Sequence, residues 1–122
     1  MDMKNYDLGF IYGLLGETVS RILLYLNTFE ESYATELARN FTMKQQTVQY
    51  HMDKLETYGI LRSRIVGRTR LYRINPRYVL RKELRALLDQ VMHYLPEEVV
   101  HEHFVKRTRP RTKGKALRKY GD

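Results

Sequence analysis

Apolar residues recur at helical spacing along most of the chain and alternate with polar ones in a single stretch. The helical spacing predicts a helix over residues 18–29, a short helix over 35–41 with Thr35 as its N-cap, and a third helix over 43–58. Gly59 ends the third helix, because glycine readily adopts the left-handed conformation that closes helices. Two short helices therefore meet at a sharp turn near residue 42.

The start of the helix over 43–58 has two alternatives. Thr42 and Gln45 fit a T-x-x-Q capping box, which begins the helix at Met43. A start two residues later leaves Lys44 as the N-cap, and lysine caps a helix poorly. The capping box favours the earlier start.

Alternation replaces the helical spacing from residue 60 to residue 75. Two alternating runs flank a turn at Val66, Gly67 and Arg68, which predicts a two-stranded hairpin. An Asn-Pro pair ends the second run. A wide apolar stripe then predicts a long helix over 77–95, followed by a short helical piece that reaches residue 104. The predicted fold class is mainly α with a small β-hairpin.

Composition points to one domain with a polyanionic partner. The chain has 122 residues, a net charge of +8 and no cysteine, which excludes disulfides, thiolate catalysis and cysteine zinc sites. Residues 106–122 hold eight Lys or Arg against one Asp, which leaves 14 basic and 13 acidic residues elsewhere. No apolar run approaches the roughly 20 residues that cross a bilayer. We expect a cytoplasmic protein with no membrane partner.

The helix over 43–58 carries the best candidate for recognition chemistry. Its apolar positions Val48, Met52 and Leu55 share one face and leave a polar face opposite. A glutamine amide can match the donor and acceptor on an adenine edge in the major groove. Alternatively, these glutamines only face water, as on any soluble helix. The candidate DNA-binding residues of this helix are Lys44, Gln45, Gln46, Gln49, Tyr50 and Lys54.

Basic residues on the hairpin and at the C-terminus are candidates for phosphate contacts. Hairpin arginines can also simply discourage aggregation, and a basic tail can be a solubilising segment. The hairpin candidates are Arg62, Arg64, Arg68 and Arg70, with Arg73 also on the hairpin. The tail candidates are Lys106, Arg107, Arg109, Arg111, Lys113 and Lys115. We expect the tail to be disordered when free and to neutralise phosphates.

Neither a catalytic constellation nor a strong metal motif is present, so we expect no enzyme activity and no cofactor. The pairs Glu30-Glu31 and Glu97-Glu98 are expected to be solvated. A weak nitrogen and oxygen site is conceivable from four residues, although solvated helix positions are the favoured interpretation. These four are His93, His101, Glu102 and His103.

The segments ELARNF, QQTVQYHMDKLETYGIL and VGRTRLYRINP resemble winged helix-turn-helix DNA-binding regulators of the ArsR type, over roughly residues 15–95. The resemblance implies that Ala38 lets two helices approach and that residues 67–70 form the wing tip. It also implies base contacts from Gln45, Gln46, Gln49 and Tyr50, and it aligns His51 with a common histidine. Thr42 and Lys44 depart from the usual glycine and serine, and the metal-binding cysteines of the arsenic and zinc sensors are missing.

These observations predict a homodimeric, sequence-selective protein that binds double-stranded DNA, most simply a transcriptional regulator. The expected organisation is an apolar lead-in over 1–17, a winged helix-turn-helix domain over 18–76, C-terminal helices over 77–104 that dimerise, and a basic tail over 105–122. Alternatives are an RNA-binding or ribosome-associated winged helix, a protein-interaction winged helix, and a DNA-binding accessory of a replication or mobile-element system.

Overall fold

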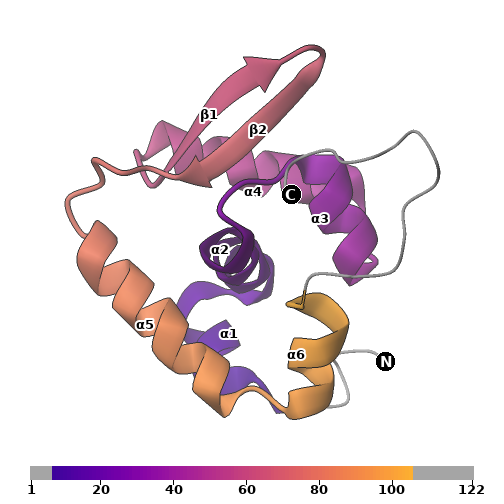
Figure 1. Ribbon diagram of the computed structural model, residues 1–122, viewed down its shortest axis with the longest axis vertical. Helices are drawn as coiled ribbons and strands as arrows, with labels where there is room; N and C mark the ends of the chain where they lie inside the picture. The colour runs from indigo at the N-terminus through magenta and orange to yellow at the C-terminus, as the bar shows by residue number, and fades with distance from the viewer. Residues whose placement is uncertain (1–6, 106–122) are drawn as a thin grey trace.

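The computed structural model describes residues 7–105, which form six helices and one β-hairpin (Figure 1). The elements in chain order are α1 (Gly9–Leu15), α2 (Glu17–Phe29), α3 (Ala34–Phe41), α4 (Gln45–Thr57), β1 (Leu61–Val66), β2 (Thr69–Ile74), α5 (Arg81–Tyr94) and α6 (Glu97–His103). The predicted fold class, mainly α with a small hairpin, is confirmed. The charged tail from residue 106 lies outside the described residues.

Helix α2 is the centre of the core. Every residue from Ser20 to Asn27 is buried, because α1, α3, α4, α5 and β2 all pack against it (Figure 1). Apolar spacing predicted this helix, and the structure buries its whole circumference from Ser20 to Asn27. A helix covered on all sides positions the elements around it.

Helix α1 forms within the predicted apolar lead-in over 1–17. It buries Leu8 and Ile11, and its chain reverses at Gly16, whose φ of 93° suits glycine. The Ser20 hydroxyl donates to the Gly16 carbonyl oxygen at 2.6 Å. Within residues 7–105 no single helix is long and apolar enough to cross a membrane; α1 and α2 pass that test only as a pair, bent by 103°.

The turn between α3 and α4 corrects the predicted start of α4. Helix α4 begins at Gln45 with Lys44 as its N-cap, so the capping-box start at Met43 is wrong. Thr42 adopts the left-handed conformation that ends α3, and the Met43 amide donates to the Ala38 carbonyl oxygen at 2.8 Å. Both residues are used in closing α3 and cannot begin α4.

The N-cap of α3 is Tyr33, not Thr35. Ser32 and Tyr72 exchange two backbone hydrogen bonds of 3.1 and 2.8 Å, which adds the α2–α3 linker to the edge of β2. This bridge keeps the linker extended up to Tyr33, whose φ is −127° and ψ is 162°, and the helix begins at the next residue.

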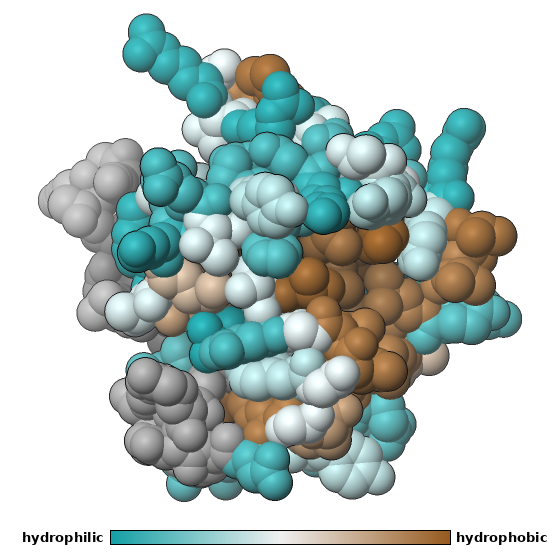
Figure 2. All heavy atoms as spheres, turned by 180° about the vertical axis from the view of Figure 1, so that it is seen from behind, coloured by the Kyte–Doolittle hydropathy of each residue, from teal (hydrophilic) through white to brown (hydrophobic). Residues whose placement is uncertain are grey.

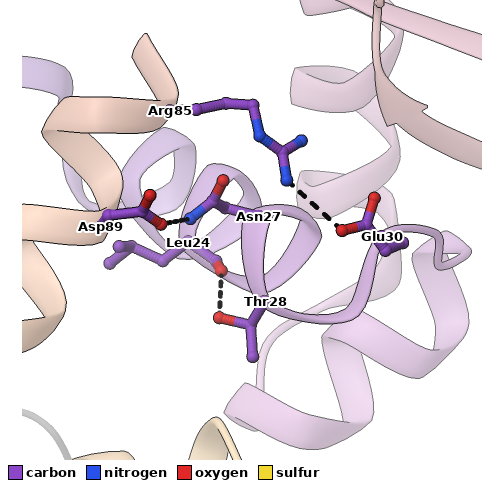
Figure 3. Close-up of polar contacts among 6 residues, drawn as sticks. All are labelled: Leu24, Asn27, Thr28, Glu30, Arg85 and Asp89. Atoms are coloured by element: carbon purple, nitrogen blue, oxygen red, sulfur yellow. Dashed lines mark hydrogen bonds and ion pairs between the residues drawn. The ribbon is translucent and has the colours of Figure 1, made fainter. Parts of the chain in front are cut away.

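Helix α5 begins at Arg81, four residues later than predicted. The Asn75 side chain ties the end of β2 by donating to the Gly59 carbonyl oxygen at 3.0 Å and accepting from the Arg77 amide at 2.9 Å. Residues 76–80 are thereby held in turns rather than in the helix. Figure 3 shows α5 tied to α2 by Asn27 Nδ2, which donates to Asp89 at 2.7 Å, and by the ion pair of Arg85 with Glu30 at 3.3 Å.

Helix α6 is anchored to the end of α3 by His103. The Asn40 side chain donates to the His103 carbonyl oxygen at 3.2 Å, and His103 Nδ1 donates to the Asn40 carbonyl oxygen at 3.1 Å. The imidazole is stacked on the Phe41 ring at 5.0 Å and is 7% exposed, so the expectation of a solvated histidine is wrong. Its buried Nε2 has no partner among the described residues.

This burial predicts a loss of stability in mild acid. Desolvation lowers the pKa of His103 below 6.5, with Arg21 acting in the same direction and Glu102 opposing it. The unfolded chain then binds the proton more readily, so the contribution of the neutral ring is complete above pH 6.5 and falls as pH drops through that value. Thermal unfolding of His103→Phe between pH 8 and pH 5.5 should depend less on pH than that of the unaltered chain. The exposed His101→Asn serves as the control, and an unchanged pH dependence for His103→Phe would contradict this account.

Candidate nucleic-acid interface

The outer face of α4 is polar and open. Val48, Met52 and Leu55 are buried beneath it, as predicted from the apolar spacing. Of the predicted contact residues, five are exposed: Lys44, Gln45, Gln46, Tyr50 and Lys54. Thr47, which the sequence analysis did not select, is exposed on the same helix. A helix start at Gln45, rather than Met43, brings Thr47 into the first turn.

Gln49 is the exception among the predicted contact residues, because its amide is used inside the protein. Its Nε2 donates to Tyr72 Oη at 2.8 Å and to Asp53 Oδ1 at 3.0 Å. Tyr72 Oη in turn donates to the same Asp53 oxygen at 2.6 Å. We call Gln49, Asp53 and Tyr72 the brace, since the three join α4 to β2.

The brace keeps its hydrogen-bond directions at physiological pH. Burial, with the hydrogen bond to Asp53 as the next cause, raises the pKa of Tyr72 to about 12. The hydroxyl therefore remains a donor to the carboxylate. Tyr72 itself is 1% exposed, whereas Asp53 lies at the surface, so the hydrogen bond between them is part-buried. The brace fixes α4 against the hairpin, and Gln46, three residues before Gln49 on the same side of the helix, remains exposed next to it.

Tyr50 and Lys54 form a second, exposed pair on α4. Lys54 Nζ donates to Tyr50 Oη at 3.1 Å and lies 5.3 Å from the centre of its ring. The hydrogen bond that Lys54 donates to Tyr50 raises the pKa of Lys54, which keeps the ammonium charged. The pair presents an aromatic face and a positive charge together.

A shallow hollow lies at the start of α4. It is lined by residues of α3 and of the turn, among them Arg39, Thr42, Lys44 and Gln45. Arg39 is exposed and basic, and the sequence analysis did not select it. Arg39 lies in the last turn of α3. It could be placed beside the first turn of α4 only after Lys44 was found to be the N-cap of α4.

The hairpin is a wing whose two faces differ. Leu61, Ser63, Tyr72 and Ile74 face α4, where Ser63 Oγ donates to Glu56 at 2.7 Å. The loop is only two residues long, since Val66 pairs with Thr69, and Gly67 adopts a φ of 66°.

The four predicted wing arginines have different surroundings. Arg68 is exposed in the loop, and Arg70 Nη1 donates to Ser63 Oγ at 2.9 Å. Arg62 lies directly opposite Arg73 on the outer face. Arg64 is in an ion pair with Glu31, so the expectation that Glu30 and Glu31 are merely solvated is wrong. Arg68 and Arg70 are the wing cations nearest the tip.

The predicted positions thus fall into three groups. One group is the exposed face of α4, and a second is the wing, which the brace joins to α4 at Tyr72 and whose Arg62 and Arg64 lie on the outer face. The tail candidates, Lys106 to Lys115, lie outside the described residues. Within residues 7–105, His, Asp and Glu form no group of three that could hold a metal ion.

Comparisons with known proteins agree with this geometry. Residues 14–64 match a family model described as a helix-turn-helix domain. Among solved structures, the chain is similar to the transcriptional regulator HlyU from Vibrio vulnificus, with a TM-score of 0.53 and 16% identity over 77% of this chain and 95% of that one. No curated protein matches the chain.

Two further solved structures are more distant. One is the MarR family transcriptional regulator SPO1453 from Silicibacter pomeroyi, with a TM-score of 0.48 and 17% identity over 70% of this chain and 60% of that one. The other is the homodimeric winged helix-turn-helix DNA-binding domain of Mb0332 from Mycobacterium bovis, a possible ArsR-family regulator, with a TM-score of 0.46 and 19% identity over 87% of this chain and 96% of that one. The family model and the likeness to HlyU give the class: the chain contains a winged helix-turn-helix domain. The resemblance to winged helix-turn-helix regulators is confirmed at the level of the fold.

Removing the Tyr72 hydroxyl should destabilise the protein. Tyr72→Phe leaves the Asp53 carboxylate without its shortest hydrogen bond, and bonds to charged groups contribute about 1.5–3 kcal/mol. Urea unfolding should show a loss of that order. Tyr58→Phe is the matched control, because Tyr58 is 67% exposed. Equal stability of the two variants would mean that the brace contributes nothing.

Proposed function

We propose that the protein binds double-stranded DNA with sequence selectivity and acts as a transcriptional regulator. The observation that carries the proposal is the exposed polar face of α4 held beside an arginine-bearing wing. A helix of this kind fits the major groove, and a wing beside it reaches the phosphate backbone. The winged helix-turn-helix fold is consistent with this use, although the fold alone does not fix function.

Base reading falls to the exposed residues of α4 outside the brace. Gln45, Gln46 and Thr47 are exposed in the first turn, and Tyr50 is exposed with its hydroxyl bound by Lys54. Gln46 offers both a donor and an acceptor, which suits an adenine edge. Gln49 is a positioning residue in this proposal, because its donor is already used within the brace.

The organisation of the chain follows from these roles. Residues 18–76 act as the DNA-binding unit, residues 77–104 act in dimerisation together with α1 from the lead-in over 1–17, and the basic residues of 105–122 neutralise phosphates. An RNA-binding role is the alternative, and the glutamine-bearing helix favours duplex DNA over it. A DNA-binding accessory of a replication or mobile-element system has the same interface and differs only in its biological use.

An apolar surface across α1 and α5 supports a homodimer. Figure 2 shows apolar atoms gathered in a continuous region of the rear face. Large side chains exposed on the two helices are Phe10 at 50%, Leu14 at 64%, Leu87 at 37% and Tyr94 at 68%. The rings of Phe10 and Tyr94 are 6.3 Å apart, so the exposed surfaces of α1 and α5 meet.

A second copy of the chain is the natural cover for this surface. Contiguous exposed apolar patches mark interaction sites on soluble proteins, and two-fold dimers are the commonest assemblies. A symmetric dimer would present two α4 helices about 34–36 Å apart, one turn of duplex DNA, to a pseudo-palindromic site.

Gln46→Ala should weaken binding to the preferred site by about 1–3 kcal/mol and relax the base preference at one position. The loss follows because an exposed glutamine of α4 would no longer pair with a base edge. The control is His93→Ala, because His93 is an exposed polar residue on the side of α5 that carries Ala86, away from Leu87 and Tyr94. Fluorescence anisotropy with the preferred and with random duplexes measures both effects. Equal losses on the two duplexes would rule out base reading by Gln46.

Replacing Arg68 and Arg70 by alanine should weaken binding to preferred and random duplexes alike. Each lost phosphate contact should reduce the slope of log affinity against log salt by about 0.9. Arg81→Ala, on α5, is the control for removal of a positive charge away from the wing. Unchanged affinity of the double variant at low salt would mean that the wing does not contact DNA.

Leu87→Glu should convert the dimer to a monomer, because it places a charge in the apolar surface of α5. Ala86→Glu adds the same charge to the same helix about 100° away from Leu87. Sedimentation equilibrium at tens of micromolar should give a dimer for the unaltered chain and for Ala86→Glu, and a monomer for Leu87→Glu. A monomeric mass for the unaltered chain would remove the homodimer from the proposal.

A further inference from the structure

Two consecutive acids in the α2–α3 linker bind different parts of the protein. Glu30 is in an ion pair with Arg85 of α5 at 3.3 Å (Figure 3). Glu31 binds Arg64 of β1 through both carboxylate oxygens, which accept from Nε and Nη2 at 2.9 Å each. Glu30 has a φ of 72°, rare for a residue with a side chain, at the point where α2 ends and the linker begins. The linker thus connects α5 with the wing.

The Glu31–Arg64 pair has the geometry of an arginine bound to phosphate. Two parallel N–H donors on two oxygens form the bidentate arrangement that guanidinium makes with carboxylates and phosphates alike. The Arg64 side chain is 59% exposed and the Glu31 side chain 28% exposed. The guanidinium is therefore occupied but remains within reach of a ligand from solvent.

Glu31 is held in place independently of Arg64. The two backbone hydrogen bonds between Ser32 and Tyr72 fix the linker along β2, and Tyr72 is itself part of the brace. Arg64, with Arg73 as a weaker contributor, lowers the pKa of Glu31 and keeps the carboxylate ionised. Because Glu31 is fixed and the Arg64 side chain is flexible, Arg64 is the partner that moves when a second anion approaches.

We propose that Glu31 occupies Arg64 as an internal substitute for a DNA phosphate, and that duplex binding exchanges this carboxylate for the phosphate. The inference rests on the proposed function and names Glu31 as a specificity-determining residue. By occupying one wing cation in the free protein, Glu31 lowers affinity for every duplex. Selection of a site then depends more on α4 than on sequence-independent attraction by the wing.

The test compares Glu31→Gln with Glu30→Gln, which removes the same charge from the neighbouring residue but frees Arg85 of α5 instead of the wing arginine. Affinities for one random duplex are measured at several salt concentrations, with Arg64→Ala and the double variant Glu31→Gln/Arg64→Ala alongside. Thermal unfolding of each variant verifies that it is folded. Gln retains the size of Glu and lacks its charge, so Arg64 is released without leaving a gap.

Glu31→Gln should bind more tightly than Glu30→Gln by up to about fivefold, because an exposed ion pair is weak. Its salt slope should stay close to that of Glu30→Gln, because Arg64 contacts a phosphate in both complexes. The double variant should lose the gain in affinity. Equal affinities of Glu31→Gln and Glu30→Gln, or a gain that survives in the double variant, would overturn the inference alone. If the unaltered chain binds no duplex, the proposed function and this inference fall together.

Discussion

The hydrogen bond from Tyr72 to Asp53 is the contact on which the arrangement of the interface depends. It joins β2 to α4 at 2.6 Å from a side chain that is 1% exposed. The same residue carries the backbone bridge to Ser32, so one tyrosine orients the wing, α4 and the α2–α3 linker. Because hydrogen bonds to a charged group are strong and directional, these three elements hold a defined relation to α2 behind them.

The division of labour on α4 follows from this contact. Gln49 and Asp53 are occupied by hydrogen bonds within the protein, whereas Gln45, Gln46 and Thr47 in the first turn of α4 are exposed to a ligand. The wing shows the same division between Arg68, which is exposed in the loop, and Arg64, which is held by Glu31. Asp53 and Glu31 thus occupy donors that could otherwise bind a ligand. A ligand that can replace these carboxylates as the acceptor is favoured.

Patterns with a strong period were predictable from the sequence. Helix α2, the hairpin and the buried face of α4 all follow from apolar spacing. The start of α4 was not predictable from the sequence, because Thr42 fits both a capping box for α4 and the end of α3. In the structure Thr42 adopts the left-handed conformation that ends α3. The shortened α5 and the internal role of Gln49 depend on contacts between residues far apart in the chain, with Gly59 and with Tyr72, which no local pattern records.

Selection from a pool of random duplexes by the full chain tests the central claim most directly. The account predicts enrichment of one sequence as a pseudo-palindrome, with half-site centres about one helical turn apart, since each α4 of a dimer would read one half-site. It also predicts that Gln46→Ala relaxes one position in each half. A pool that shows no enriched sequence, or preferential recovery of hairpin RNA offered in competition, would contradict it.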